Sequence, residues 1–69
     1  MEARNKKLSP MEDIILNYSA QGYSSKEIAL ELGGSKRTVE THKTRILLKL
    51  GATNITNAVG IYAKQGLLQ

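Results

Sequence analysis

The sequence predicts an all-α fold of four short helices, which we expect near residues 9–21, 25–32, 36–50 and 54–65. Two observations support this prediction. A serine or asparagine that can cap a helix stands at the start of each segment, and apolar residues recur at helical spacing within it. A chain of 69 residues makes one small domain with little core to spare, so its stability depends on economical helix packing.

The first helix has the clearest start signal. Ser9 can cap it, Pro10 suits its first position, and Glu12 completes a capping box. Gly22 stands where a left-handed residue would end the helix. The preceding residues 1–7 are basic and lack apolar periodicity, which predicts a mobile arm.

The second helix repeats this pattern. Ser24 and Glu27 have the spacing of another capping box. Gly33 and Gly34 follow the helix and give a tight turn the backbone freedom it needs. Ser35 then caps the next helix.

The third helix ends at Gly51 and has two different faces. At about 100° per residue, Val39, Ile46 and Leu50 fall on one line and form the inner face. The opposite face carries Arg37, Glu40, Thr41, Thr44, Arg45 and Leu48. Such a face is usually just solvated. Here it follows a capped partner helix and a tight turn, which favours a surface that reads a DNA groove.

The last helix starts with Asn54 as its cap and contains Gly60 in its interior. This glycine costs roughly 1 kcal/mol relative to alanine, but it allows another backbone to approach closely. Together the four helices predict a core of apolar side chains: Leu8, Ile14, Ile15, Tyr18, Ile28, Ala29, Leu32, Val39, Ile46, Leu50, Ala58, Val59 and Tyr62.

The composition narrows the possible functions. A formal net charge of +4 and a pI near 9.6 suit a nucleic-acid partner, although anionic membranes and acidic proteins also attract such a chain. No cysteine is present to form a disulfide or a thiolate metal site, which fits a reducing cytoplasm. Because there is neither an apolar run of about 18 residues nor a signal-peptide pattern, we expect a soluble, unexported domain.

No pattern of catalytic residues is visible. His42 is the only histidine, and no nucleophile or carboxylate pair surrounds it at a catalytic spacing. The glycines do not form a phosphate-binding loop, because no strand precedes them and the Walker pattern is missing. We therefore expect no enzyme, no cofactor and no metal site.

Residues 24–42 have the layout of a helix-turn-helix, in which two short amphipathic helices are joined by a glycine-containing turn. The second helix starts with Lys36 and Arg37, and in such a unit it can lie in the major groove of DNA. A single basic domain built around this unit is most simply a DNA-binding module.

Four segments in a fixed order carry a family resemblance: LSPME at residues 8–12, GYSSKEIA at 22–29, SKRTVETH at 35–42 and KLGA at 49–52. They resemble the LuxR-type, or GerE-type, helix-turn-helix domain over about residues 8–68. The resemblance implies the DNA-binding part of a bacterial transcription regulator, located in the cytoplasm at the nucleoid. It also implies that the third helix is the recognition helix and that the fourth joins two copies, chiefly on DNA.

The resemblance assigns roles to individual positions. The base-contacting residues would be Glu40, Thr41 and Thr44. The phosphate-contacting residues would be Ser25, Lys26, Lys36, Arg37, Thr38, Lys43 and Lys49. The surface between two copies would include Ile55, Gly60, Ile61 and Lys64. The sequence departs from the family pattern at Met11, Ile14, Gly34, Leu48, Ile55 and Asn57.

Two alternative functions stay open at this point. A module like region four of a sigma factor uses a similar helix-turn-helix, although the fourth capped helix favours the LuxR type. A protein-interaction module that has lost DNA binding is the other, because Glu40 and Leu48 lie on the outward face. The chain would be either a stand-alone regulator or the effector part of a longer one, and RNA polymerase is a further candidate partner.

Overall fold

The computed structural model describes residues 8–65, and within them it confirms the predicted all-α fold. The predicted arm at residues 1–7 lies outside the described residues. The described helices are α1 (Pro10–Ala20), α2 (Ser25–Leu32), α3 (Lys36–Leu50) and α4 (Ile55–Lys64).

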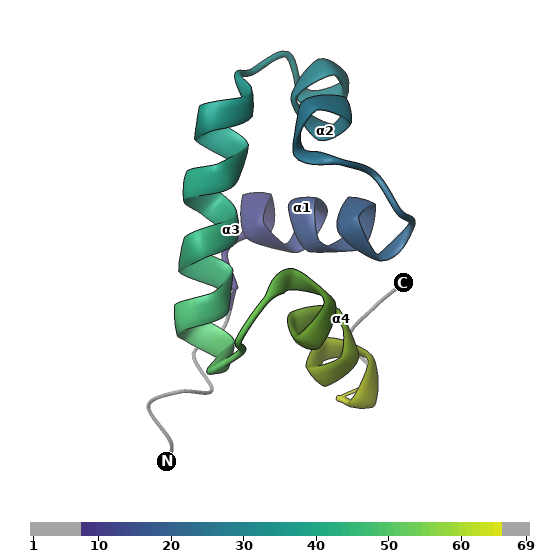
Figure 1. Cartoon of the computed structure of the whole chain (residues 1–69), viewed down its shortest axis with the longest axis vertical. Coiled ribbons are helices and arrows are strands. Elements are labelled where there is room, and N and C mark those ends of the chain that lie inside the picture. Colours follow the sequence, from purple (N-terminus) through teal and green to yellow (C-terminus); the bar gives the residue numbers. More distant parts are fainter. Residues whose placement is uncertain (1–7, 66–69) are drawn as a thin grey trace.

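The helices are arranged around α1, which contacts each of the other three (Figure 1). The longest helix, α3, runs along one side of the molecule, and α1, α2 and α4 all pack on the same side of it. Among these helices, α2 and α4 do not contact each other. Because its three partners lie on one side, α3 keeps one long face that no other helix within residues 8–65 covers.

The predicted caps set the helix boundaries. The capping box at α1 is formed, with the Glu12 backbone N–H donating to Ser9 Oγ at 3.2 Å and the Ser9 N–H donating to Glu12 Oε1 at 2.9 Å. Ser24 and Glu27 form the same pair of bonds at α2. The bounds of α2 and α3 match the prediction, whereas α1 and α4 are each one residue shorter at both ends. The reason is that the predicted ranges included the capping residues themselves.

The core contains most of the predicted side chains. Ten apolar residues are buried in one cluster: Leu8, Ile15, Leu16, Ile28, Ala29, Val39, Ile46, Leu50, Ala58 and Tyr62. Three of the predicted core residues, Tyr18, Leu32 and Val59, are only partly buried and pack against this cluster.

Two positions of α1 differ from the prediction. Ile14, expected in the core, is exposed, whereas Leu16, which was not predicted, is fully buried. The inward arc of α1 consists of Glu12, Ile15 and Leu16, and Ile14 lies on the opposite side of the helix. The sequence pattern was misleading because this arc contains a charged residue.

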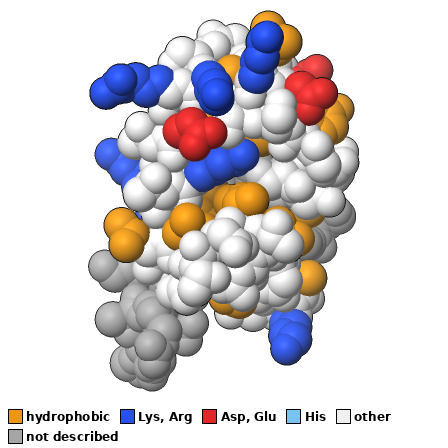
Figure 2. Space-filling view, in the orientation of Figure 1, with side chains coloured by type: hydrophobic (Ala, Val, Ile, Leu, Met, Phe, Trp, Pro, Cys, Tyr) orange, Lys and Arg blue, Asp and Glu red, His pale blue; other side chains and the backbone are white. Residues whose placement is uncertain are grey.

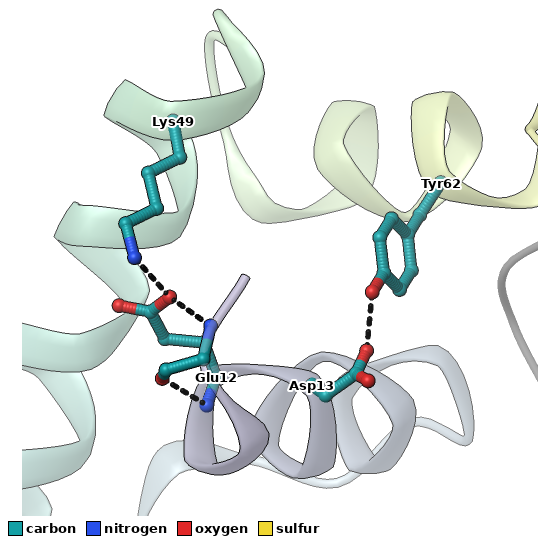
Figure 3. A network of polar contacts seen from close by, with 5 residues as sticks. Glu12, Asp13, Lys49 and Tyr62 are labelled. Carbon is teal, nitrogen blue, oxygen red and sulfur yellow. Dashed lines mark hydrogen bonds and ion pairs between the residues drawn. The ribbon is translucent and has the colours of Figure 1, made fainter. Parts of the chain in front are cut away.

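That charged residue is Glu12, whose carboxylate is buried between α1 and α3 (Figure 3). Lys49 Nζ approaches Glu12 Oε1 to 2.7 Å and forms an ion pair with it. Burial alone would raise the pKa of Glu12. The hydrogen bonds from Lys49 and Ser9 outweigh this effect and hold that pKa below its usual value. The pair joins the N-terminal turn of α1 to the C-terminal part of α3.

A second polar contact joins α1 to α4 (Figure 3). The Tyr62 hydroxyl, on a side chain otherwise in the core, donates a hydrogen bond to the Asp13 carboxylate. Burial, together with this contact to Asp13, raises the pKa of Tyr62 to about 12. Thus α1 has one polar contact to α3, through Glu12, and one to α4, through Asp13.

Candidate nucleic-acid interface

The free surface of α3 lies opposite its buried line. Only Val39, Ile46 and Leu50 of this helix are buried. Glu40, Thr41 and Thr44, the predicted base-contacting residues, are all exposed. The structure therefore places these three side chains on one accessible face, as reading a DNA groove requires.

The N-terminal turn of α3 has several features that favour an anionic ligand. Ser35 caps it, accepting a hydrogen bond from the Thr38 N–H at 3.1 Å, and its hydroxyl also lies 3.0 Å from the Thr38 hydroxyl. Lys36 and Arg37 follow directly and are exposed. Since a helix N-terminus carries a partial positive charge, the helix dipole and these two side chains both favour a negatively charged ligand.

Basic side chains gather at this end of the molecule. Figure 2 shows Lys and Arg over the region where α2 lies and α3 begins, with a few acidic side chains among them. Lys26 is exposed at the start of α2, and Lys43 is partly exposed on α3. Together with the first turn of α3, they supply cations from both helices of the unit.

Two of the predicted phosphate contacts have a less favourable position. Ser25 is only 6% exposed, which leaves it almost no surface for a phosphate. The ammonium group of Lys49 is already paired with Glu12 inside the protein. Sequence reasoning missed this pairing because the two residues are 37 positions apart and no local pattern connects them. Both phosphate assignments stay predictions, and they are the weakest of the set.

The hydroxyl groups of the two threonines are turned back onto the helix. Thr41 Oγ1 donates to the carbonyl oxygen of Arg37, and Thr44 Oγ1 donates to that of Glu40, both at 3.1 Å. Beyond them, Leu48 on the same face is 75% exposed. The outward face therefore combines a carboxylate, two threonines and a leucine between its arginines.

The single histidine of the chain lies on α3 beside the buried line. His42 is partly buried, and its Nδ1 is buried without a hydrogen-bond partner among the described residues. A catalytic histidine is normally oriented by a second group at this nitrogen.

No cluster of three or more potential metal-binding side chains occurs in residues 8–65. None of the helices in that range has both the length and the apolar character needed to cross a bilayer.

The predicted contact surface on α4 is partly accessible. Gly60 and Lys64 are exposed, and Ile61 is partly buried. Ile55 packs against the core with part of its side chain, so it offers less outer surface than the sequence suggested. A Cβ at Gly60 would meet no atom within 4 Å, which shows that this stretch of α4 is open.

A capped helix with a free outward face and a basic first turn, joined to a capped partner by a glycine turn, defines a helix-turn-helix DNA-binding domain. The sequence model of the GerE family, described as bacterial regulatory proteins of the luxR family, matches residues 6–62. The chain belongs to this family of DNA-binding transcription regulators, which is not a family of enzymes. Of the two helix-turn-helix classes that the sequence left open, the match supports the LuxR type and not a sigma-factor region.

Individual relatives agree with this assignment. The transcriptional regulatory protein YdfI of Bacillus subtilis is 46% identical over 61 residues, which cover 88% of this chain and 29% of YdfI. The oxygen regulatory protein NreC of Staphylococcus aureus is 45% identical over 62 residues, or 90% of this chain and 29% of NreC. The solved structure of the response regulator ChrA, from a heme-sensing two-component system, has a TM-score of 0.86 and 38% identity. It covers 91% of this chain and 31% of ChrA. The chain thus spans less than a third of these proteins.

Proposed function

We propose that this domain binds double-stranded DNA in a sequence-specific manner, with α3 in the major groove, as the DNA-binding part of a bacterial transcription regulator. The exposed face of α3 carries this proposal, because it follows a basic, serine-capped turn and none of the other described helices covers it. An α-helix fits the width of the major groove of B-DNA, where the edges of all four base pairs can be distinguished.

The contacts divide into two groups. Lys26, Lys36, Arg37, Thr38 and Lys43 would contact phosphates, because they surround the start of α3 and are at least partly exposed. Ser25 and Lys49 are secondary members of this group for the reasons given above. The base-contacting group is Glu40, Thr41 and Thr44. A glutamate can accept a hydrogen bond from cytosine N4, and a threonine methyl can contact a thymine methyl.

The assembly around this domain is part of the proposal. One recognition helix covers only a few base pairs, so two copies joined through α4 on neighbouring half-sites would add affinity and specificity. The relatives are named as regulators about three times as long, which favours an effector role for this domain in the cytoplasm, at the nucleoid. RNA polymerase is a candidate partner because regulation must act on transcription. We assign no catalytic activity and no cofactor.

Binding to random duplexes, followed by sequencing of the bound fraction, tests the proposal. We expect a defined consensus, and an affinity that falls steeply with salt because bound phosphates release their counterions. If no consensus emerges and the chain binds duplex DNA no better than other proteins of charge +4, the proposal is wrong, and a protein-interaction module becomes the better interpretation.

Charge reversal then locates the interface. On a duplex with a single half-site, Lys36→Glu should weaken binding to all sequences and reduce the salt slope by roughly 1–2. The matched control is Lys64→Glu, which makes the same charge change at the far end of α4. Equal losses in the two variants would contradict an interface at the start of α3.

A further inference from the structure

The hydrogen bonds of Thr41 and Thr44 determine what these side chains offer to DNA. Each hydroxyl proton is committed to a carbonyl oxygen one helical turn earlier, at 3.1 Å, although both side chains are exposed. A hydroxyl has one donor proton and two acceptor lone pairs. Each threonine therefore presents a methyl group and an oxygen that can still accept, but no free donor.

The surroundings of the threonines reinforce this chemistry. Positions 41, 44 and 48 lie on one line along α3, and the third of them is Leu48, whose side chain is 75% exposed. Arg37 lies at the N-terminal end of this line, and Arg45 lies at its edge. Between the two arginines, the centre of the outward face has methyl groups and acceptors where many recognition helices have Arg, Lys, Asn or Gln.

Among the base pairs, only A·T matches both properties in the major groove. It presents the thymine C5-methyl group beside the adenine N6 amino donor. A G·C pair also presents a donor, the cytosine N4 amino group, but it has no methyl group, and its two guanine acceptors give no hydrogen bond to a threonine without a free donor.

We propose that Thr41 and Thr44 select A·T base pairs by packing their methyl groups on thymine methyls, while their hydroxyl oxygens accept from adenine N6. This inference rests on the proposed binding of α3 in the major groove and specifies which bases that groove must contain. The methyl contacts are the apolar part of this selection, and the exposed Leu48 extends the apolar surface by one turn.

Base analogues in the selected duplex test this inference directly. The positions opposite the threonines are those whose preference changes in Thr41→Ala and Thr44→Ala, and they should be A·T pairs. Replacing thymine by uracil at one such position removes only the C5-methyl group, and it should weaken binding about three- to fivefold. Replacing the A·T pair by guanine paired with 5-methylcytosine should recover part of the affinity that is lost with ordinary cytosine.

Protein variants separate the methyl contact from the hydroxyl contact. Thr41→Ser keeps the hydroxyl but lacks the methyl, so it should bind the thymine and uracil duplexes nearly equally. Thr41→Val keeps methyl groups and should still distinguish the two duplexes. For the apolar extension, Leu48→Ala is compared with Leu30→Ala, which truncates an equally exposed leucine on α2, at 76%. Only Leu48→Ala should reduce affinity.

The outcomes distinguish this inference from the proposed function. Absence of any specific duplex binding would refute the proposed function itself. Specific binding with G·C pairs at the threonine positions, or with equal affinity for thymine and uracil duplexes, would leave the proposed function intact and overturn this inference.

Discussion

Gly33 and Gly34 are adjacent in the turn before α3, but they have different backbone requirements. Gly33 has a left-handed backbone with φ of +74° and closes α2 by donating its N–H to the Ala29 carbonyl oxygen. Gly34 lies outside this conformational region, and a Cβ there would meet no atom within 4 Å. Only the first of the two glycines is required by the geometry of the turn.

We therefore expect opposite effects from the same substitution at these neighbours. Gly33→Ala should lower the free energy of unfolding by about 1–2 kcal/mol, because a side chain disfavours the left-handed region. Gly34→Ala should raise it by about 0.4–1 kcal/mol, because it reduces the entropy of the unfolded chain without strain. Urea denaturation of both variants measures the difference, and destabilisation of similar size in both would contradict this assignment.

Tyr62 gives the fold a dependence on alkaline pH. Its pKa is raised to about 12 in the folded state, from an ordinary value of 10.0, first by burial and then by its bond to Asp13. The protonated phenol is therefore favoured by folding. Its contribution is complete below about pH 10 and is lost as the pH rises to about 12.

The Tyr62→Phe variant tests this dependence. In the wild-type protein, ionisation of Tyr62 should remove roughly 2–3 kcal/mol of stability across that pH range, and Tyr62→Phe should lack this part of the decline. Denaturation at a series of pH values measures it. Because burial is the larger cause, Asp13→Asn should retain most of the wild-type slope. Parallel pH profiles for wild type and Tyr62→Phe would contradict a buried, neutral phenol.

At the scale of the helices, the contact between α1 and α3 depends on Glu12 and Lys49. Glu12 is 3% exposed, and the Lys49 side chain is 29% exposed, so the pair is intermediate between a surface and a buried ion pair. Removing Lys49 would leave the Glu12 carboxylate against the core without a cationic partner. Such a group costs far more than the loss of a surface ion pair.

We expect Lys49→Met to reduce the free energy of unfolding by about 2 kcal/mol. Glu12→Gln should reduce the free energy of unfolding less in the Lys49→Met variant than in the wild-type protein, because the two side chains interact. The pKa of Glu12 is below 4.5 in the folded protein, so the pair stabilises the fold above about pH 4.5. This contribution is lost as the pH falls through the lowered pKa. Denaturation of the two single variants and the double variant at neutral and acidic pH measures both effects.

The same variant tests the phosphate assignment of Lys49. If the lysine acts only within the protein, folded Lys49→Met should bind a single half-site with nearly wild-type affinity and an unchanged salt slope. A slope reduced by about 1 would show instead that the lysine leaves Glu12 to contact a phosphate.

The helices show which parts of the fold can be predicted from sequence. Capping boxes and glycine stops act over three or four residues, so the bounds of α2 and α3 were predictable without tertiary information. The inward arc of α1 was not, because it includes Glu12, and a charged residue is normally assigned to the surface. Its distant partner Lys49, together with the Ser9 N–H of the capping box, compensates this burial.

For the whole molecule, the base-contacting part of the candidate site was predictable because its three residues lie on one helix. The periodicity of α3 alone places Glu40, Thr41 and Thr44 opposite the buried line. The orientation of the threonine hydroxyls required coordinates, because a helical threonine has two accessible χ1 rotamers. Which residues contact phosphates depends on how α2 and α3 pack, and for this reason the burial of Ser25 was not foreseen.

The assembly of two domains on DNA is the last property to test at this scale. α4 has 10 residues and a length of about 15 Å, so a contact through it buries much less than the roughly 1,200–2,000 Å² of a stable interface. We therefore expect a monomer at micromolar concentration, which sedimentation measures. On a duplex with two half-sites about 34–36 Å apart, we expect cooperative binding.

Gly60→Leu should abolish this cooperativity, because a bulky side chain would keep two α4 helices apart. The substitution should leave the fold intact, since Gly60 is exposed and a Cβ there meets no atom within 4 Å. Binding to a duplex with one half-site is the control, and its affinity should equal that of the wild type. Titration of the two-half-site duplex with both proteins gives the cooperativity. If the wild type binds without cooperativity and the folded variant behaves identically, α4 is not the contact between copies, and any dimer must form through another part of the regulator.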